Sequence, residues 1–206
     1  MKLAQLTSPD LIMLDAVFED RFAAINALTD RIDQAGKLTD RQQFLDAVLL
    51  REEEGPTALG EYLAVPHGKS NAVKEPVFAC ALVKDELQWQ GLDGDEPVNM
   101  IFLLAIPPAQ AGSTHMAVLT TLTSLLVEDD FREALLKAST PEEVMTLFGA
   151  GEAQNEAEAD EEKVVAEKGS EVEEEQTEMA RDISAKAYPM VLGAGVLISV
   201  ILFLML

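Results

Sequence analysis

Cysteine, histidine and positive charge are all scarce in this sequence of 206 residues. The single cysteine, Cys80, excludes an intramolecular disulfide, and two histidines, His67 and His115, supply too few ligands for a structural zinc site. Fifteen Lys and Arg against 37 Asp and Glu give a net charge of −22, which argues against a surface built to hold nucleic-acid phosphates. We therefore expect a cytosolic protein that binds neither a metal nor a nucleic acid.

Long apolar runs are also rare, except at the C-terminal end. Nothing near Met1 has the apolar stretch of a signal peptide, whereas Tyr188–Leu206 contains no charged residue and is long enough to cross a bilayer as a helix. Arg181 and Lys186 precede it, so the positive-inside tendency predicts an upstream domain on the cytoplasmic side, anchored to the inner membrane. One alternative is a buried core helix, but such a helix would need a polar stripe, and Ser199 is the one polar side chain after Pro189. The other alternative is a longer membrane protein that has been cut short.

An acidic segment separates this apolar stretch from the rest of the chain. Residues 149–187 are dominated by Glu, Asp, Ala, Gln and Gly, and they contain too few large apolar side chains to form a core. We interpret residues 149–187 as a disordered linker between a folded domain at 1–148 and a transmembrane helix at 188–206. A regulatory acidic tail is the alternative.

Residues 1–148 show the periodicities of alternating helices and strands. Apolar residues at steps of three and four predict helices over 20–35, ended by Gly36, and over 38–54, capped by Thr39 or Asp40. The inward residues would be Phe22, Ile25, Leu28 and Ile32 in the first helix and Phe44, Leu45, Val48 and Leu49 in the second. Apolar runs predict strands at 63–65, 77–83 and 98–106, the last covered on both faces, and helices follow at 114–127, 130–137 and 141–148. This order predicts a layered α/β domain.

His67 follows a short apolar strand in the segment Leu63-Ala64-Val65-Pro66-His67-Gly68. The proline stiffens the chain before the imidazole, and the glycine leaves the backbone open to a group that approaches the ring. Because sites in α/β proteins tend to lie at the ends of strands, this position suits a functional histidine. A turn histidine hydrogen-bonded to the backbone is the alternative.

Two further residues could bind an anion. His115 follows Ser113-Thr114 in the first turn of a predicted helix, where unpaired N–H groups favour phosphoryl or carboxylate oxygens. Arg51 ends the second helix and carries the planar fork that suits phosphate. The alternatives are a surface His115 beside a capping hydroxyl, and an Arg51 solvated near its acidic neighbours.

Together, Glu52, Leu59-Gly60 and Leu63-Ala64-Val65-Pro66-His67-Gly68 resemble the phosphohistidine signature of type-2 enzyme IIA domains, from the fructose and mannitol family of the bacterial phosphoenolpyruvate:sugar phosphotransferase system (PTS). The resemblance covers about Leu3 to Phe148 and is closest to the fructose-like branch, which includes permeases for mannosyl-glycerate-type substrates. It implies an α/β fold with a mixed central sheet flanked by helices, followed here by the acidic linker and one C-terminal transmembrane helix.

The resemblance also implies roles for the three residues. His67 would accept a phosphoryl group from the phosphocarrier HPr and pass it to a cysteine of an enzyme IIB domain, while His115 and Arg51 would stabilise the phosphoryl group. No cofactor or metal is required. Cys80 lies in a predicted strand and fits a buried core residue, so the enzyme IIB acceptor is expected on a separate chain. The alternatives are a regulatory protein like the nitrogen-related enzyme IIA proteins, whose phosphorylation state controls a partner, and a truncated permease.

Overall fold

The computed structural model describes residues 2–110 and 113–149, with the backbone only at residues 110, 113–117 and 127. The predicted transmembrane helix at 188–206 and the predicted linker beyond residue 149 lie outside the described residues. Among the residues that are described, no helix has the length and apolar character needed to cross a membrane.

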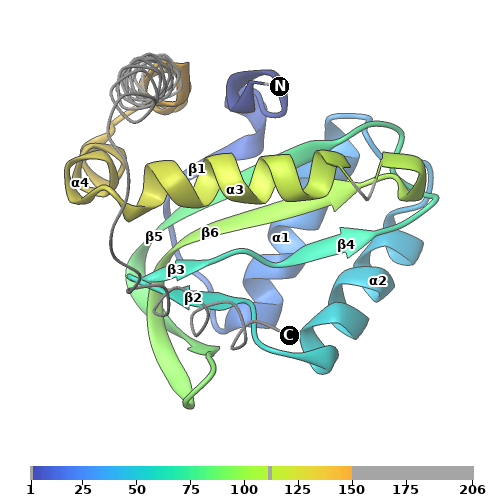
Figure 1. The fold of residues 1–206 in the computed structure, drawn as a ribbon, viewed down its shortest axis with the longest axis horizontal. Coiled ribbons are helices and arrows are strands. Elements are labelled where there is room, and N and C mark those ends of the chain that lie inside the picture. Colours follow the sequence, from blue (N-terminus) through green and yellow to red (C-terminus); the bar gives the residue numbers. More distant parts are fainter. Residues whose placement is uncertain (1, 111–112, 150–206) are drawn as a thin grey trace, which may run out of the picture. The chain divides into compact units, whose positions relative to one another are not determined.

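A mixed sheet of six strands forms the centre of the described domain (Figure 1). Its strands are β1 (Ile12–Ala16), β2 (Ala58–Gly60), β3 (Leu63–Ala64), β4 (His67–Lys69), β5 (Val77–Gln90) and β6 (Asp95–Ile106). The order is β1-β5-β6-β3-β2, and β4 follows β3 alongside β6. β5 and β6 form an antiparallel hairpin, whereas β1 runs parallel to β5 and both β3 and β4 run parallel to β6. The mixed α/β fold expected from the resemblance is therefore confirmed.

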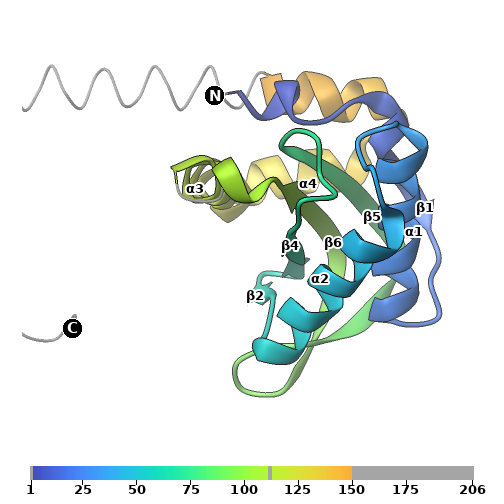
Figure 2. The same ribbon diagram turned by 90° about the vertical axis from the view of Figure 1, so that its right-hand side faces the viewer.

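Helices cover both faces of the sheet (Figure 2). On one face lie α1 (Arg21–Gln34) and α2 (Arg41–Glu54), and on the other lie α3 (Ser113–Val127), α4 (Asp129–Lys137) and a helix at residues 141–149. Single 3₁₀ turns occur at Leu3–Gln5, Pro9–Leu11 and Pro108–Gln110.

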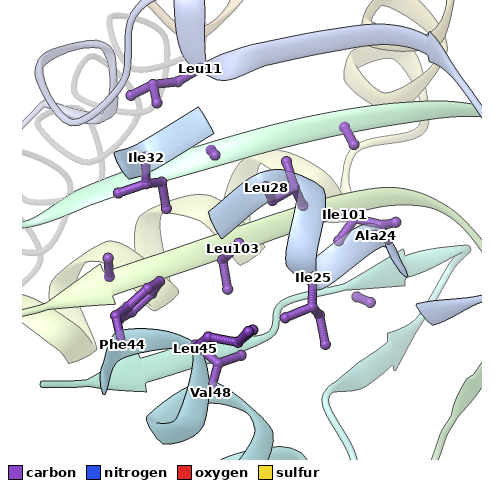
Figure 3. Close-up of a cluster of buried hydrophobic side chains, with 14 of the residues drawn as sticks. Leu11, Ala24, Ile25, Leu28, Ile32, Phe44, Leu45, Val48, Ile101 and Leu103 are labelled. Atoms are coloured by element: carbon purple, nitrogen blue, oxygen red, sulfur yellow. The ribbon is translucent and has the colours of Figure 1, made fainter. Parts of the chain in front are cut away.

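β6 is buried on both faces because its side chains alternate between two apolar clusters. Ile101 and Leu103 pack toward α1 and α2, in the cluster drawn in Figure 3, whereas Phe102 and Leu104 pack against the opposite layer of helices. This confirms the prediction of a central strand covered on both sides. It also makes β6 the rigid element beside which β4 is placed.

The two predicted N-terminal helices form, with small corrections. Asp40 caps α2 by accepting a hydrogen bond from the Gln43 amide at 3.0 Å, so the helix begins at Arg41, and Leu38 pairs with Val73 instead. The prediction that Phe22 faces the core is wrong, because its side chain remains 44% exposed. It lies under the Arg21 guanidinium, 4.8 Å from the ring centroid, in the first turn of α1.

The strands differ more from the sequence prediction than the helices do. β5 continues from the predicted end at residue 83 to Gln90, through the exposed Lys84, Asp85 and Glu86. Pairing with β6 resumes at Leu87 and continues to Gln90, whereas these three polar residues fall within a register shift between Leu82 and Leu87. β1, β2 and β4 were not predicted, because strands this short depend on their neighbours in the sheet.

Candidate functional site

β4 brings His67 to α2 through a close approach at the next residue. A Cβ atom on Gly68 would lie 2.7 Å from Val48 Cγ2 and 3.2 Å from the Val48 backbone nitrogen, so only glycine allows this spacing. Arg51 lies three residues after Val48 and thus on the same side of the helix. The missing side chain of Gly68 therefore allows His67 and Arg51 to meet.

Both nitrogens of the His67 ring have defined partners. Nδ1 lies 3.0 Å from the carbonyl oxygen of Val65, and because a carbonyl can only accept, Nδ1 carries the proton. Nε2 then holds the lone pair, and it accepts a hydrogen bond from Arg51 Nε at 3.0 Å. The backbone contact expected of a turn histidine is present, and it leaves Nε2 as the ring nitrogen with a lone pair.

The surroundings of His67 favour its neutral form. Burial lowers the pKa of the imidazole below its ordinary value, and the positive charges of Arg51 and Lys69 lower it further, against the opposing effect of the bond to Val65. A neutral imidazole with its lone pair on Nε2 is a nucleophile at neutral pH.

Arg51 is held in place and does not simply extend into solvent. Its Nη1 donates to the carbonyl oxygen of Gly55 at 3.0 Å while its Nε contacts His67. A hollow of about 320 Å³ opens beside this pair. Its lining residues are Ala47, Leu50, Arg51, Glu54, His67 and Lys69. Even with a neutral His67, the basic side chains of Arg51 and Lys69 outnumber the one acidic side chain, Glu54. Such a hollow can hold a doubly charged phosphoryl group between two cations.

The other predicted positions have different outcomes. His115 lies in the first turn of α3, but its side chain is outside the described part of the chain, so its role stays a prediction. Cys80 is fully buried in β5, and burial raises the pKa of its thiol, which confirms the expected core position. Among the described residues, no group of three or more His, Cys, Asp or Glu side chains could hold a metal ion.

Sequence reasoning assigned no role in this region to Lys69, Thr57 or Trp89. Lys69 could have been found, because a residue two positions after His67 in a strand shares its face. Thr57 and Trp89 are joined to Glu52 by buried hydrogen bonds. Trp89 comes from β5, so no local pattern could have connected it to the histidine segment.

Comparison with known proteins agrees with this geometry. The sequence profile of the family described as "Phosphoenolpyruvate-dependent sugar phosphotransferase system, EIIA 2" matches residues 5–150. The chain belongs to this family. The resemblance found in the sequence is thereby confirmed.

Two curated relatives and one solved structure illustrate the range of the EIIA type-2 family. The chain is 51% identical over 148 residues to the PTS system 2-O-alpha-mannosyl-D-glycerate-specific EIIABC component of Escherichia coli, an alignment covering 72% of this chain but only 22% of that longer protein. It is 33% identical to the PTS system fructose-specific EIIA component of Haloferax volcanii, covering 71% of this chain and 94% of that protein. The crystal structure of the nitrogen regulatory protein IIA-Ntr from Neisseria meningitidis aligns with a TM-score of 0.65 and 25% identity, over 70% of this chain and 97% of that one.

Proposed function

We propose that this chain takes a phosphoryl group from phospho-HPr onto Nε2 of His67 and passes it to the cysteine of an enzyme IIB domain on a separate chain. The observation that supports this most directly is the bond from Nδ1–H to the Val65 carbonyl, which leaves the lone pair on Nε2. The EIIA type-2 family and the position of His67 within its signature supply the reaction class.

The transfer needs no group beyond the two proteins. The lone pair of His67 Nε2 forms a bond to phosphorus while the P–N bond of phospho-HPr breaks, and the electron pair of that bond returns to the imidazole of HPr. The proton stays on Nδ1 and keeps its hydrogen bond to the Val65 carbonyl throughout. In the second transfer, a cysteine thiolate of enzyme IIB attacks phosphorus, and Nε2 regains its lone pair. Catalysis then consists of positioning and of stabilising the phosphoryl oxygens.

Arg51 has two tasks in this proposal. Before transfer its Nε–H covers the His67 lone pair at 3.0 Å, so the guanidinium must shift when phosphorus arrives. The shifted guanidinium, with Lys69 and the predicted contribution of His115, would then bind the phosphoryl oxygens in the hollow beside the ring.

For the physiological role we propose uptake of a fructose-like sugar, with mannosyl-glycerate as the first candidate. The support is the 51% identity to the EIIA part of the Escherichia coli protein. In this proposal residues 1–148 form the enzyme IIA domain on the cytoplasmic side, residues 149–187 are the linker, and residues 188–206 anchor the chain in the inner membrane near the transporter. Such tethering would raise the local concentration of donor and acceptor.

A regulatory role is the second candidate. It is supported by the fold match and 25% identity to the nitrogen regulatory protein of Neisseria meningitidis. In that case phosphorylation of His67 would change the binding of a partner protein, and no enzyme IIB would accept the phosphoryl group.

The test is phosphoryl transfer from radiolabelled phosphoenolpyruvate, through purified enzyme I and HPr, to the full-length chain. We expect an acid-labile, base-stable label that disappears in His67→Ala and persists, with slower formation, in His115→Ala. A folded wild-type chain that takes no label would overturn the proposed function. Label that persists in His67→Ala would overturn the assignment of the nucleophile.

A second step separates uptake from regulation. The labelled chain is mixed with the enzyme IIB segment of the mannosyl-glycerate-specific protein, and with an enzyme IIB variant whose cysteine is replaced by serine as a control. Rapid loss of label to the unmodified enzyme IIB alone supports uptake. Retention of the label on His67 with both, and with a fructose-specific enzyme IIB, favours the regulatory role.

A further inference from the structure

A buried network of three polar side chains begins at Glu52, the residue that follows Arg51 in α2. The Trp89 indole Nε1 donates to Thr57 Oγ1 at 2.9 Å, and the Thr57 hydroxyl donates to Glu52 Oε1 at 2.5 Å. Trp89 is fully buried, and Thr57 and Glu52 are only 2% and 3% exposed. The single hydroxyl of Thr57 thus serves as acceptor and donor at once, which uses its hydrogen and one lone pair.

Thr57 sits in the short turn between α2 and β2, and two backbone carbonyls of this turn reach the site. The carbonyl of Gly55 accepts from Arg51 Nη1 at 3.0 Å. The carbonyl of Thr57 accepts from the Val65 amide at 2.9 Å, and the carbonyl of Val65 in turn accepts from His67 Nδ1. One turn therefore supports both the arginine and the peptide that orients the histidine.

The network fixes this turn from the inside. Glu52 holds it to α2, next to Arg51, and Trp89 holds it to β5, an element distant in the sequence. A buried hydroxyl with both partners in place has one rotamer and one position, whereas an apolar side chain of the same shape would leave the turn attached only through its backbone.

We propose that Thr57 is a positioning residue of this site: its hydroxyl, held between Trp89 and Glu52, sets the turn on which the ring tautomer of His67 and the placement of Arg51 depend. The expected effect on phosphoryl transfer rests on the proposed function of His67. The effect on the tautomer does not, because the tautomer is a property of the unphosphorylated chain.

The test compares Thr57→Val, which removes the hydroxyl but keeps the shape, with Thr57→Ser, which keeps the hydroxyl. The ¹⁵N shifts of the His67 ring are measured on the full-length chain at a pH above the imidazole pKa, with His67→Ala to assign the signals of the two histidines. Initial rates of labelling through enzyme I and HPr are measured on the same samples.

We expect wild type and Thr57→Ser to keep the proton on Nδ1, and Thr57→Val to move toward the mixture of tautomers that free histidine adopts. The labelling rate should fall about tenfold in Thr57→Val, the scale of a displaced catalytic group, and stay within about twofold in Thr57→Ser. A folded Thr57→Val with the wild-type tautomer and rate would overturn the proposal, because a hydroxyl that acts only on stability moves neither.

Trp89→Phe provides a second route if Thr57→Val does not fold. It removes the indole N–H and leaves the Thr57–Glu52 bond, so we expect the same change of tautomer and rate, smaller in size; an unchanged tautomer and rate would count against the proposal. If the wild-type chain takes no label while the tautomer still responds to Thr57→Val, the positioning role stands and the proposed function fails.

Discussion

Gly68→Ala tests whether the contact between β4 and α2 builds the site. The added Cβ would lie 2.7 Å from Val48 Cγ2 and 3.0 Å from Phe44 Cε2, whereas carbon atoms in contact prefer about 3.5 to 4.0 Å. The strand and the helix must therefore separate by roughly 1 Å. Overpacking of this kind costs about 1 to 3 kcal/mol in the free energy of unfolding. Backbone strain adds nothing, since the φ angle of Gly68 lies outside the left-handed region.

The same separation of β4 from α2 would also move His67 away from Arg51. Arg51 Nε lies 3.0 Å from His67 Nε2, and a separation of roughly 1 Å takes this pair beyond hydrogen-bonding distance. We expect phosphoryl acceptance to fall about 10- to 100-fold. The pKa of His67 should rise, because Arg51 lowers it in the wild type. Urea unfolding, the labelling assay and an NMR titration of the His67 ring measure the three effects.

A double-variant cycle with Val48→Ala provides the control. Val48→Ala alone leaves a cavity and costs about 2 kcal/mol, but it also removes the methyl group that the Cβ added by Gly68→Ala would meet. The double variant should therefore be more stable than the sum of the two single effects by roughly 1 kcal/mol, with part of the labelling rate restored. Strict additivity, or a Gly68→Ala chain as stable and as active as wild type, would refute the steric argument.

Four further predictions concern pH, capping and the buried thiol. The titration midpoint of His67 should lie below 6.5, so its contribution to stability is present above pH 6.5 and is lost as the pH falls; NMR titration checks the midpoint, and a value above 6.5 contradicts it. Burial raises the pKa of Glu52, so wild type should lose stability relative to Glu52→Gln as the pH rises above 4.5; urea unfolding of both chains at several pH values would show no such trend if the carboxylate were well solvated. Asp40→Ala should lower the free energy of unfolding by about 1 kcal/mol through loss of the α2 cap, whereas no loss would mean that the capping bond is not formed in solution. A maleimide should label Cys80 only after unfolding, and rapid labelling of the native chain would contradict its burial in β5.

Much of the architecture could be predicted because it depends on residues near one another in the chain. Helical periodicity and a capping aspartate are local, so α1 and α2 were placed to within a few residues. The uninterrupted apolar run of β6 revealed a strand covered on both faces. Phe22 had the correct spacing for the core, but periodicity does not show which residues of the helix the sheet covers, and the ring stays exposed beside Arg21.

The sequence by itself determined the candidate residues and the family, because the segment from Leu63 to Gly68 and the acidic position at Glu52 are contiguous or nearly so. Only the tertiary structure decided the ring tautomer of His67 and its contacts. The Nδ1 proton is assigned by a carbonyl two residues away, and the contact with Arg51 requires Gly68 to lie against α2 while β4 pairs with β6. The contact with Arg51, the approach of Gly68 to α2 and the pairing of β4 with β6 join segments that are separated in the chain. Their distances are set by packing, which no local pattern of residue types encodes.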